Sequence, residues 1–115
     1  MLLTIDEHST QSLQDQLTGQ LRQAIASADL KSGEKLPPAR QLAESLHVNV
    51  HTVLRAFQTL RDEGLLEIRR GRGTMVTGSA LLLAVPSQLA KQLVDEARQL
   101  GLGNTEIRNL LEVHL

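Results

Sequence analysis

The stretch PPARQLAESLHVNVHTVLRAFQTLRDEG, residues 37–64, predicts two helices separated by a short connection. Apolar residues recur every three or four positions on both sides of residues 47–49, so we expect a short helix over 39–46 and a longer one over 50–63. Pro37 and Pro38 suit the entry to the first helix, because the first turn of a helix needs no proline N–H. Asn49 is a suitable N-cap for the second helix, and Gly64 is a suitable stop.

The chain before this stretch predicts one more helix, over residues 12–28. Its buried face is marked by apolar residues at helical spacing, namely Leu13, Leu17, Leu21, Ile25 and Ala28. We expect Ser9 or Thr10 to cap its start. A turn at residues 31–34 and a short extended segment, Lys35-Leu36, connect it to the helix over 39–46.

The chain after this stretch predicts a β-hairpin. Apolar and charged residues alternate within residues 65–70, which is the pattern of a half-buried strand. A Gly-Arg-Gly turn at residues 71–73 leads into a second strand over residues 74–77. The order helix, helix, short turn, helix, hairpin is that of a winged helix-turn-helix.

Residues 78–115 predict a separate helical tail. Gly78-Ser79 indicates a boundary, so we expect the winged helix-turn-helix domain at residues 1–77 and the tail at residues 78–115. Two helical stripes follow, separated by residues 101–103, and Asn104 can cap the second. Their apolar positions are Leu89, Leu93, Ala97, Leu100, Ile107, Leu110 and Leu111. The predicted fold is therefore mainly α with a small β-hairpin, a winged helix-turn-helix followed by a two-helix hairpin.

The composition limits the classes of function. The formal net charge of −1 is no sign of a nucleic-acid binder, and a single aromatic residue, Phe57, argues against a platform that stacks bases on rings. The absence of cysteine excludes disulfides and thiolate metal sites. The longest apolar run, residues 80–86, is too short to span a bilayer, and residues 1–10 do not resemble a signal peptide. We therefore expect a cytoplasmic protein.

The element order itself predicts binding to double-stranded DNA. The helix over 50–63 is narrow enough for the major groove, where each base pair presents a distinct pattern of donors and acceptors. Arg69, Arg70 and Arg72 crowd a hairpin turn that glycines keep slim. Arginine suits phosphates and the negative potential of a narrow minor groove. The alternative for this turn is a solvated loop without a ligand.

Several spaced motifs resemble the GntR family of bacterial regulators over about residues 10–77. The motifs are Leu30-Lys31-Ser32-Gly33-Glu34-Lys35-Leu36-Pro37, Arg40-Gln41-Leu42-Ala43, Thr52-Val53, Glu63-Gly64-Leu65 and Arg69-Arg70-Gly71-Arg72-Gly73-Thr74. The short tail and the run Asn49-Val50-His51-Thr52-Val53 are most similar to the YtrA-type subfamily. Members of that subfamily end in two helices that form a dimer.

The resemblance implies roles for individual residues. Arg40 matches an arginine on the second helix that contacts DNA, where a planar fork can grip phosphate or guanine. Thr52 matches a threonine at the start of the recognition helix, whose hydroxyl and nearby amides suit a phosphate. Arg70 and Gly71 match contacts at the wing tip. The alternative for Arg40 is a surface salt bridge with Glu44, four residues later.

Two departures from the family pattern change the expected base contacts. Many GntR proteins carry arginines where this chain has Val50 and Leu54. Arg55 lies one position further, which is about 100° around the helix. We therefore expect Asn49, His51 and Arg55 to be the variable DNA contacts.

The tail is expected to pair with the same tail of a second chain through the seven apolar positions named above. A short hairpin with one apolar face is unstable alone, and a two-fold dimer would read an inverted-repeat operator. The alternative is that the tail folds back on its own chain. Two short helices leave no room for the effector domain of larger GntR regulators, so a small-molecule effector stays undetermined and no cofactor is expected.

The sequence thus predicts a homodimeric DNA-binding regulator, by resemblance a repressor, rather than an enzyme. A winged-helix protein-interaction module that never touches DNA is the alternative, because fold alone does not define function. No phosphate loop or arrangement of nucleophile and base is present. His47 and His51 lie four residues apart, but a turn separates them and no carboxylate completes a metal site, so no metal is expected.

Overall fold

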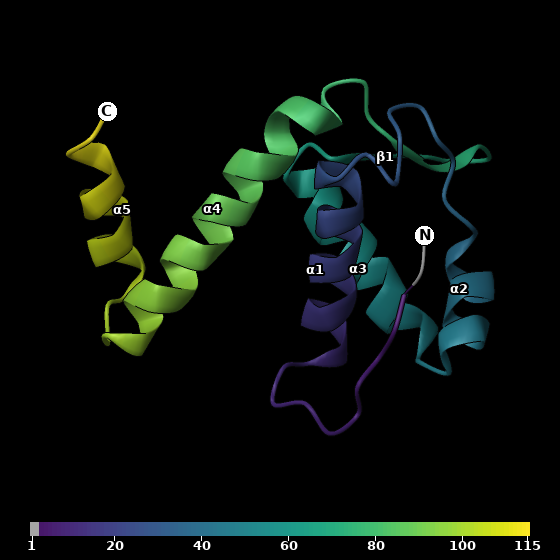
Figure 1. Ribbon diagram of the computed structural model, residues 1–115, viewed down its shortest axis with the longest axis horizontal. Helices are drawn as coiled ribbons and strands as arrows, with labels where there is room; N and C mark the ends of the chain where they lie inside the picture. The colour runs from purple at the N-terminus through teal and green to yellow at the C-terminus, as the bar shows by residue number, and fades with distance from the viewer. Residues whose placement is uncertain (1–2) are drawn as a thin grey trace. The chain divides into compact units, whose positions relative to one another are not determined.

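The computed structural model describes residues 3–115, except for the side chain of Leu81. Its elements in chain order are α1 (Leu13–Ala26), α2 (Ala39–Leu46), α3 (Val50–Asp62), β1 (Leu66–Arg69), β2 (Gly73–Val76), α4 (Ala80–Gln99) and α5 (Asn104–Glu112) (Figure 1). The predicted fold class is confirmed, because the described helices and the antiparallel hairpin follow the predicted order. Two compact units divide between Val85 and Pro86, past the predicted boundary after Thr77.

Helix α1 begins where a serine satisfies its first free N–H groups. Ser12 is the N-cap, and its Oγ accepts a hydrogen bond from the Asp15 N–H at 3.0 Å. The prediction that Ser9 or Thr10 caps this helix is wrong, because the apolar face starts only at Leu13. The Ser9 Oγ instead accepts from the Gln11 N–H at 3.1 Å and closes a local turn.

Two caps set the connection between α2 and α3. His47 takes a left-handed φ of +57° as the C-cap of α2, and the Val48 N–H donates to the Ala43 carbonyl at 3.0 Å. Asn49 caps α3 as predicted, since its side chain accepts from the His51 N–H at 2.8 Å. These bonds define where α3 begins and therefore which of its residues face outward.

The core of the first unit is aliphatic around a single aromatic ring. Its buried residues on α1 and α3 are Leu17, Leu21, Ala24, Ile25, Val53, Ala56, Phe57 and Leu60. Ala80 and Ala84, at the start of α4, are fully buried in the same core, so this part of α4 belongs to the first unit. The sequence predicts a helical tail from residue 78, but not that the first turns of this helix pack into the core of the first unit. The apolar run 80–86 had no polar positions to reveal a period, and it ends in Pro86.

A third segment supports the β-hairpin, which forms the wing. The extended chain before α2 runs along β2, where the Gly33 N–H donates to the Val76 carbonyl at 2.8 Å. The Leu36 N–H donates to the Thr74 carbonyl at the same distance. A two-stranded hairpin alone is only marginally stable, so this pairing helps to hold the wing in place. The extended segment at 35–36 was predicted, but its pairing was not.

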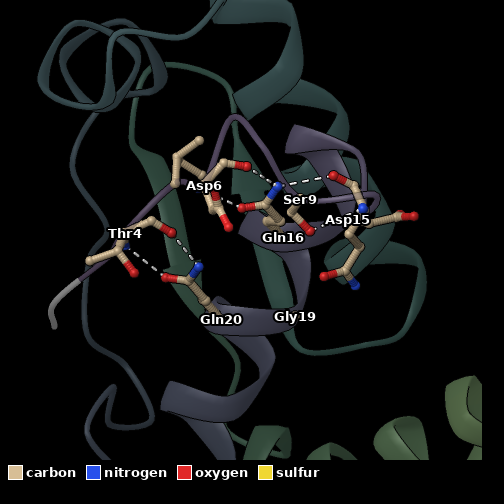
Figure 2. Close-up of a pocket in the computed structure, with 9 residues that line it drawn as sticks. Thr4, Asp6, Ser9, Asp15, Gln16, Gly19 and Gln20 are labelled. Carbon is tan, nitrogen blue, oxygen red and sulfur yellow. Dashed lines mark hydrogen bonds between the residues drawn. The ribbon is translucent and has the colours of Figure 1, made fainter.

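Two glutamines hold the N-terminal segment along α1. Gln20 accepts from the Thr4 N–H at 2.9 Å and donates to the Thr4 carbonyl. One turn earlier, Gln16 makes the same pair of bonds with Asp6, at 2.8 and 2.9 Å (Figure 2). The spacings match, because four helical residues rise about 6 Å and two extended residues about 6.6 Å. The glutamine amides thus satisfy backbone groups of a segment that no strand pairs.

The second unit, residues 86–115, is a helical hairpin. α4 continues through Pro86, and Gly101, with a φ of +86°, lets the chain turn before α5. The predicted cap at Asn104 is wrong: Gly103 is the N-cap, and it makes no side-chain hydrogen bond. Asn104 is instead the first residue of α5, and its Oδ1 accepts from the guanidinium of Arg98. Within residues 3–115 no helix is both long and apolar enough to cross a membrane.

Candidate nucleic-acid interface

Helix α3 turns a polar face away from the core. Because Val53 and Phe57 point inward, the helical period directs His51, Arg55 and Gln58 toward solvent, and all three are exposed. Among the described residues, Arg55 forms no ion pair. Two of the predicted variable contacts, His51 and Arg55, therefore lie on the accessible face of the helix.

The start of α3 offers fewer free donors than the sequence suggests. The Asn49 Oδ1 already accepts from the His51 N–H, so mainly the amide nitrogen of Asn49 remains for a ligand. The Thr52 N–H donates to the Asn49 carbonyl at 3.0 Å. Of the two groups expected to suit a phosphate at Thr52, the hydroxyl remains and the backbone amide is already bonded.

Arg40 is the second residue of α2 and is exposed. In the part of the chain that the structure describes, it makes no salt bridge with Glu44, which was the alternative to a DNA contact. Pro38 is the N-cap of α2 and provides no side-chain hydrogen bond. The guanidinium of Arg40 is therefore available at the start of α2.

The arginines of the wing are not equivalent. Arg69 Nε donates to the Glu67 carboxylate at 2.6 Å, whereas Arg70 and Arg72 are exposed and form no ion pair within residues 3–115. Gly71 has a φ of +80°, a conformation that glycine adopts without steric cost. The turn therefore presents Arg70 and Arg72 freely, while part of the charge of Arg69 is balanced.

The structure adds a cation to the wing that sequence reasoning missed. Lys35 is exposed, and its backbone forms an isolated antiparallel β-bridge with Met75 on β2. It lies over Gly73, where a Cβ would come within 3.0 Å of the Lys35 Cε. The sequence did predict an extended segment at Lys35-Leu36, which could have pointed to Lys35. It did not show that this segment pairs with β2.

A groove of about 400 Å³ lies between α3, the chain before α2 and the wing. Leu54 and Ile68 line it, each 39% exposed, together with the buried Phe57. Two exposed cations, Lys35 and Arg72, also line it. The groove therefore combines an apolar surface with positive charge.

A partly buried ion pair joins α1 to the C-cap of α3. The Arg22 guanidinium donates two hydrogen bonds to the Glu63 carboxylate, at 2.9 and 2.6 Å, and Arg22 is only 5% exposed. A bidentate pair of this kind fixes both distance and orientation. The two residues lie 41 positions apart, so only the folded chain reveals the pair.

The seven apolar positions predicted for dimerisation fall into two groups. Ala97 and Ile107 are buried, 4% and 5% exposed, and Leu93 is half-buried. The others are open to solvent, from 41% for Leu110 to 81% for Leu100, and they are Leu89, Leu100, Leu110 and Leu111. These four leucines are the positions of that set that a second chain could cover.

The described residues hold no group of three or more histidine, cysteine, aspartate or glutamate side chains that could bind a metal ion. The interface candidates are therefore hydrogen-bond donors, cations and apolar side chains. The element order places the protein in the winged helix-turn-helix class.

Residues 13–76 match the model of the bacterial regulatory proteins of the gntR family. This protein therefore belongs to the GntR family. The HTH-type transcriptional repressor YtrA of Bacillus subtilis (strain 168) is 31% identical over 106 residues, which are 87% of this chain and 82% of that relative. The expected resemblance to the GntR family is confirmed, and these relatives are regulators rather than enzymes.

Solved structures agree with this assignment. YtrA from Sulfolobus acidocaldarius, a GntR-family transcription factor, is 28% identical, with a TM-score of 0.66 over 96% of this chain and 93% of that one. The DNA-binding domain of AraR in complex with operator ORX1 shares the fold at 23% identity, with a TM-score of 0.58 over 67% of this chain and 99% of that chain.

Proposed function

We propose that this protein is a transcription repressor that binds an inverted-repeat DNA operator as a homodimer in the bacterial cytoplasm. The observation that carries DNA binding is the set of exposed cations without an ion pair in the described chain, on the elements that a winged helix-turn-helix turns toward DNA. These cations are Lys35, Arg40, Arg55, Arg70 and Arg72.

Each element has a part in the proposed complex. α3 enters the major groove, where His51, Arg55 and the free amide nitrogen of Asn49 reach base edges. Arg40 and the Thr52 hydroxyl contact the backbone beside it. The wing lies in the adjacent minor groove, with Arg70 and Arg72 as its cations and Gly71 allowing close approach. Arg69, already paired with Glu67, contributes less.

Dimerisation is supported by the exposed leucines of the tail. A two-helix hairpin of residues 86–115 has too little volume to enclose Leu89, Leu100, Leu110 and Leu111, and water in contact with them is unfavourable. Relatives named YtrA align with the tail as well as with the DNA-binding domain, since both matches span most of this chain. A two-fold axis through paired tails gives two half-sites in inverted repeat.

The tail itself is a poor effector site. The hollow between α4 and α5, lined by Val94, Arg98 and Ile107, has a volume of about 190 Å³. Typical ligand pockets hold about 300–1,000 Å³. A small molecule that regulates DNA binding through the tail would therefore need a pocket formed by the tails of two chains.

The test begins with selection of duplexes from a random-sequence library by the full-length chain. Binding to the recovered duplex should weaken by about a thousandfold or more between 50 and 200 mM salt, if six or more phosphates are contacted. Arg40→Ala and Arg70→Ala should each lower affinity and reduce the salt slope by about one unit. Arg108→Ala, an exposed arginine of the tail, is the matched control and should change neither.

The outcomes separate the alternatives. Unchanged affinity of Arg40→Ala and Arg70→Ala at fixed salt would mean that the assigned contacts are incorrect. Absence of any enriched duplex would favour the protein-interaction module. For repression, the recovered duplex is placed between a promoter and a reporter gene, and co-expression of the protein should lower reporter output. A rise would identify an activator.

A further inference from the structure

The groove between α3 and the wing contains an exposed apolar surface on the side of the protein that meets DNA. Leu54 and Ile68 are each 39% exposed, whereas Phe57 beneath them is 2% exposed. Leu54 is the one strongly apolar residue among the exposed positions 51, 54, 55 and 58 of α3. Water in contact with the neighbouring Leu54 and Ile68 side chains is unfavourable, so an apolar group of a bound ligand would find a favourable contact here.

The direction of Leu54 follows from the helical period. It lies about 100° around α3 from the buried Val53 and the same angle from the exposed Arg55, on the flank between core face and outer face. Because Leu54 lines the groove with Ile68, this flank faces the wing. When α3 lies in the major groove, the side of the groove next to the wing is formed by one sugar–phosphate strand. The base edges nearest to that strand lie beside it.

Only one base presents an apolar group to the major groove, and that group is the C5-methyl of thymine. The methyl lies on the side of the base nearer to its own sugar–phosphate strand, so a flank residue of the helix can reach it. Leucine has neither donor nor acceptor and cannot recognise the hydrogen-bonding atoms of guanine, adenine or cytosine. Lys35 and Arg72 in the same groove complement the phosphates beside such a thymine.

We propose that Leu54 is a specificity-determining residue that packs, with Ile68, against the 5-methyl group of one thymine in each operator half-site. The proposal rests on the proposed function, because it requires a bound duplex. It assigns base discrimination to a position that carries no hydrogen-bonding group.

The experiment uses the full-length chain and the duplex recovered by selection. Each thymine is replaced, one at a time, by deoxyuridine, which lacks only the 5-methyl group. At one thymine of each half-site, this replacement should lower wild-type affinity about fourfold, the effect of one buried methyl group. The same replacement should leave the affinity of Leu54→Ala unchanged, because that variant has already lost the contact.

Two further variants control the measurement. Leu54→Met keeps an apolar side chain of similar volume and should retain the loss on deoxyuridine replacement. Gln58→Ala, an exposed position of α3 outside the groove lining, should retain it as well. Thermal unfolding of each variant confirms that it is folded, which the partial exposure of Leu54 favours.

Each outcome is decisive. If the wild type tolerates deoxyuridine at every thymine, Leu54 does not contact a methyl group, and the proposed function stands without it. If Leu54→Ala remains sensitive at the same thymine, another residue makes the contact and the assignment is overturned. If no duplex is enriched by selection, both the proposed function and this inference are overturned.

Discussion

The first unit and the tail handle their apolar residues in opposite ways. The first unit encloses Leu17, Phe57 and Leu60 almost completely, whereas Leu89 and Leu100 in the tail are 61% and 81% exposed. Size explains part of the difference, because a two-helix hairpin can enclose only a few side chains, here Ala97 and Ile107. The first unit has a closed core, and it carries unpaired cations beside the partly exposed Leu54 and Ile68 on its surface. The tail leaves its leucines incompletely packed.

The contrast shows that the chemistry of an exposed surface indicates the kind of partner that could cover it. Unpaired arginines around α3 and the wing are complementary to a polyanion, while exposed leucines at helical spacing are complementary to another apolar face. If this view is correct, damage to the first unit should affect folding at any protein concentration. Damage to the tail should act through association.

The largest effect is expected from removing the one aromatic ring of the core. Phe57→Ala should lower the free energy of unfolding by about 3–5 kcal/mol, the usual result of emptying such a site. Urea titration followed by circular dichroism measures it, and the loss should be the same at all protein concentrations. A loss below about 1 kcal/mol would mean that the core repacks freely around the site.

The next effect is expected in the tail. Leu89→Glu combined with Leu100→Glu should weaken self-association by about a thousandfold, since each central apolar residue of an interface contributes about 2 kcal/mol. Sedimentation equilibrium measures the association constant. The far-ultraviolet signal of helices α1–α3 should persist at high dilution. An unchanged association constant would support the alternative that the tail folds back on its own chain.

Breaking the partly buried ion pair should have an intermediate effect on stability. Glu63→Gln leaves Arg22 without its bidentate carboxylate partner, at an expected cost of about 1.5–3 kcal/mol. The matched control is Glu67→Gln, which removes the exposed partner of Arg69 and should cost at most about 1 kcal/mol. If Glu63→Gln and Glu67→Gln lower stability equally in thermal unfolding, the burial of Arg22 does not strengthen its ion pair.

The smallest expected effect is an increase in the free energy of unfolding. Ala28 has a φ of +62°, which a residue with a Cβ adopts at a cost of about 1–2 kcal/mol. Ala28→Gly relieves that strain but adds about 0.5–1 kcal/mol of conformational entropy to the unfolded chain. The variant should therefore be more stable by about 0.5–1 kcal/mol in urea titration.

The matched control for this gain is Gly64→Ala. Gly64 has a φ of +84°, and an added Cβ would lie 2.8 Å from the Leu83 Cδ1. The Gly64→Ala variant should therefore have a lower free energy of unfolding in the same urea titration. A loss on Ala28→Gly would show that the backbone at residue 28 is not strained.

Local patterns were sufficient to predict most elements of the first unit. The bounds of α2 and the N-cap at Asn49 follow from neighbours within four residues, as does the end of α3 before Gly64. A helical tail was predicted from residue 78, but the packing of the first turns of α4 into the first core was not, because in an all-apolar run no polar positions show which face is buried.

The candidate interface could be predicted only in part. Arg40, Arg70 and Arg72 stand out by residue type and spacing, and the structure leaves them exposed. Lys35 was missed because its place beside Gly73 depends on pairing between a segment before α2 and a strand forty residues later in the chain. The division of the tail's apolar positions into buried and exposed also depends on how the hairpin closes.

The sequence by itself determined the helices, the wing and the family, because caps, glycines and helical periods act over a few residues. Only the tertiary structure decided which charges are free and which are neutralised. Arg22 finds the carboxylate of Glu63, 41 residues away, while Arg40, Arg70 and Arg72 form no ion pair within residues 3–115. It also placed Leu54 in a groove beside the wing. The reason is that pairing and burial depend on distances between segments far apart in the chain.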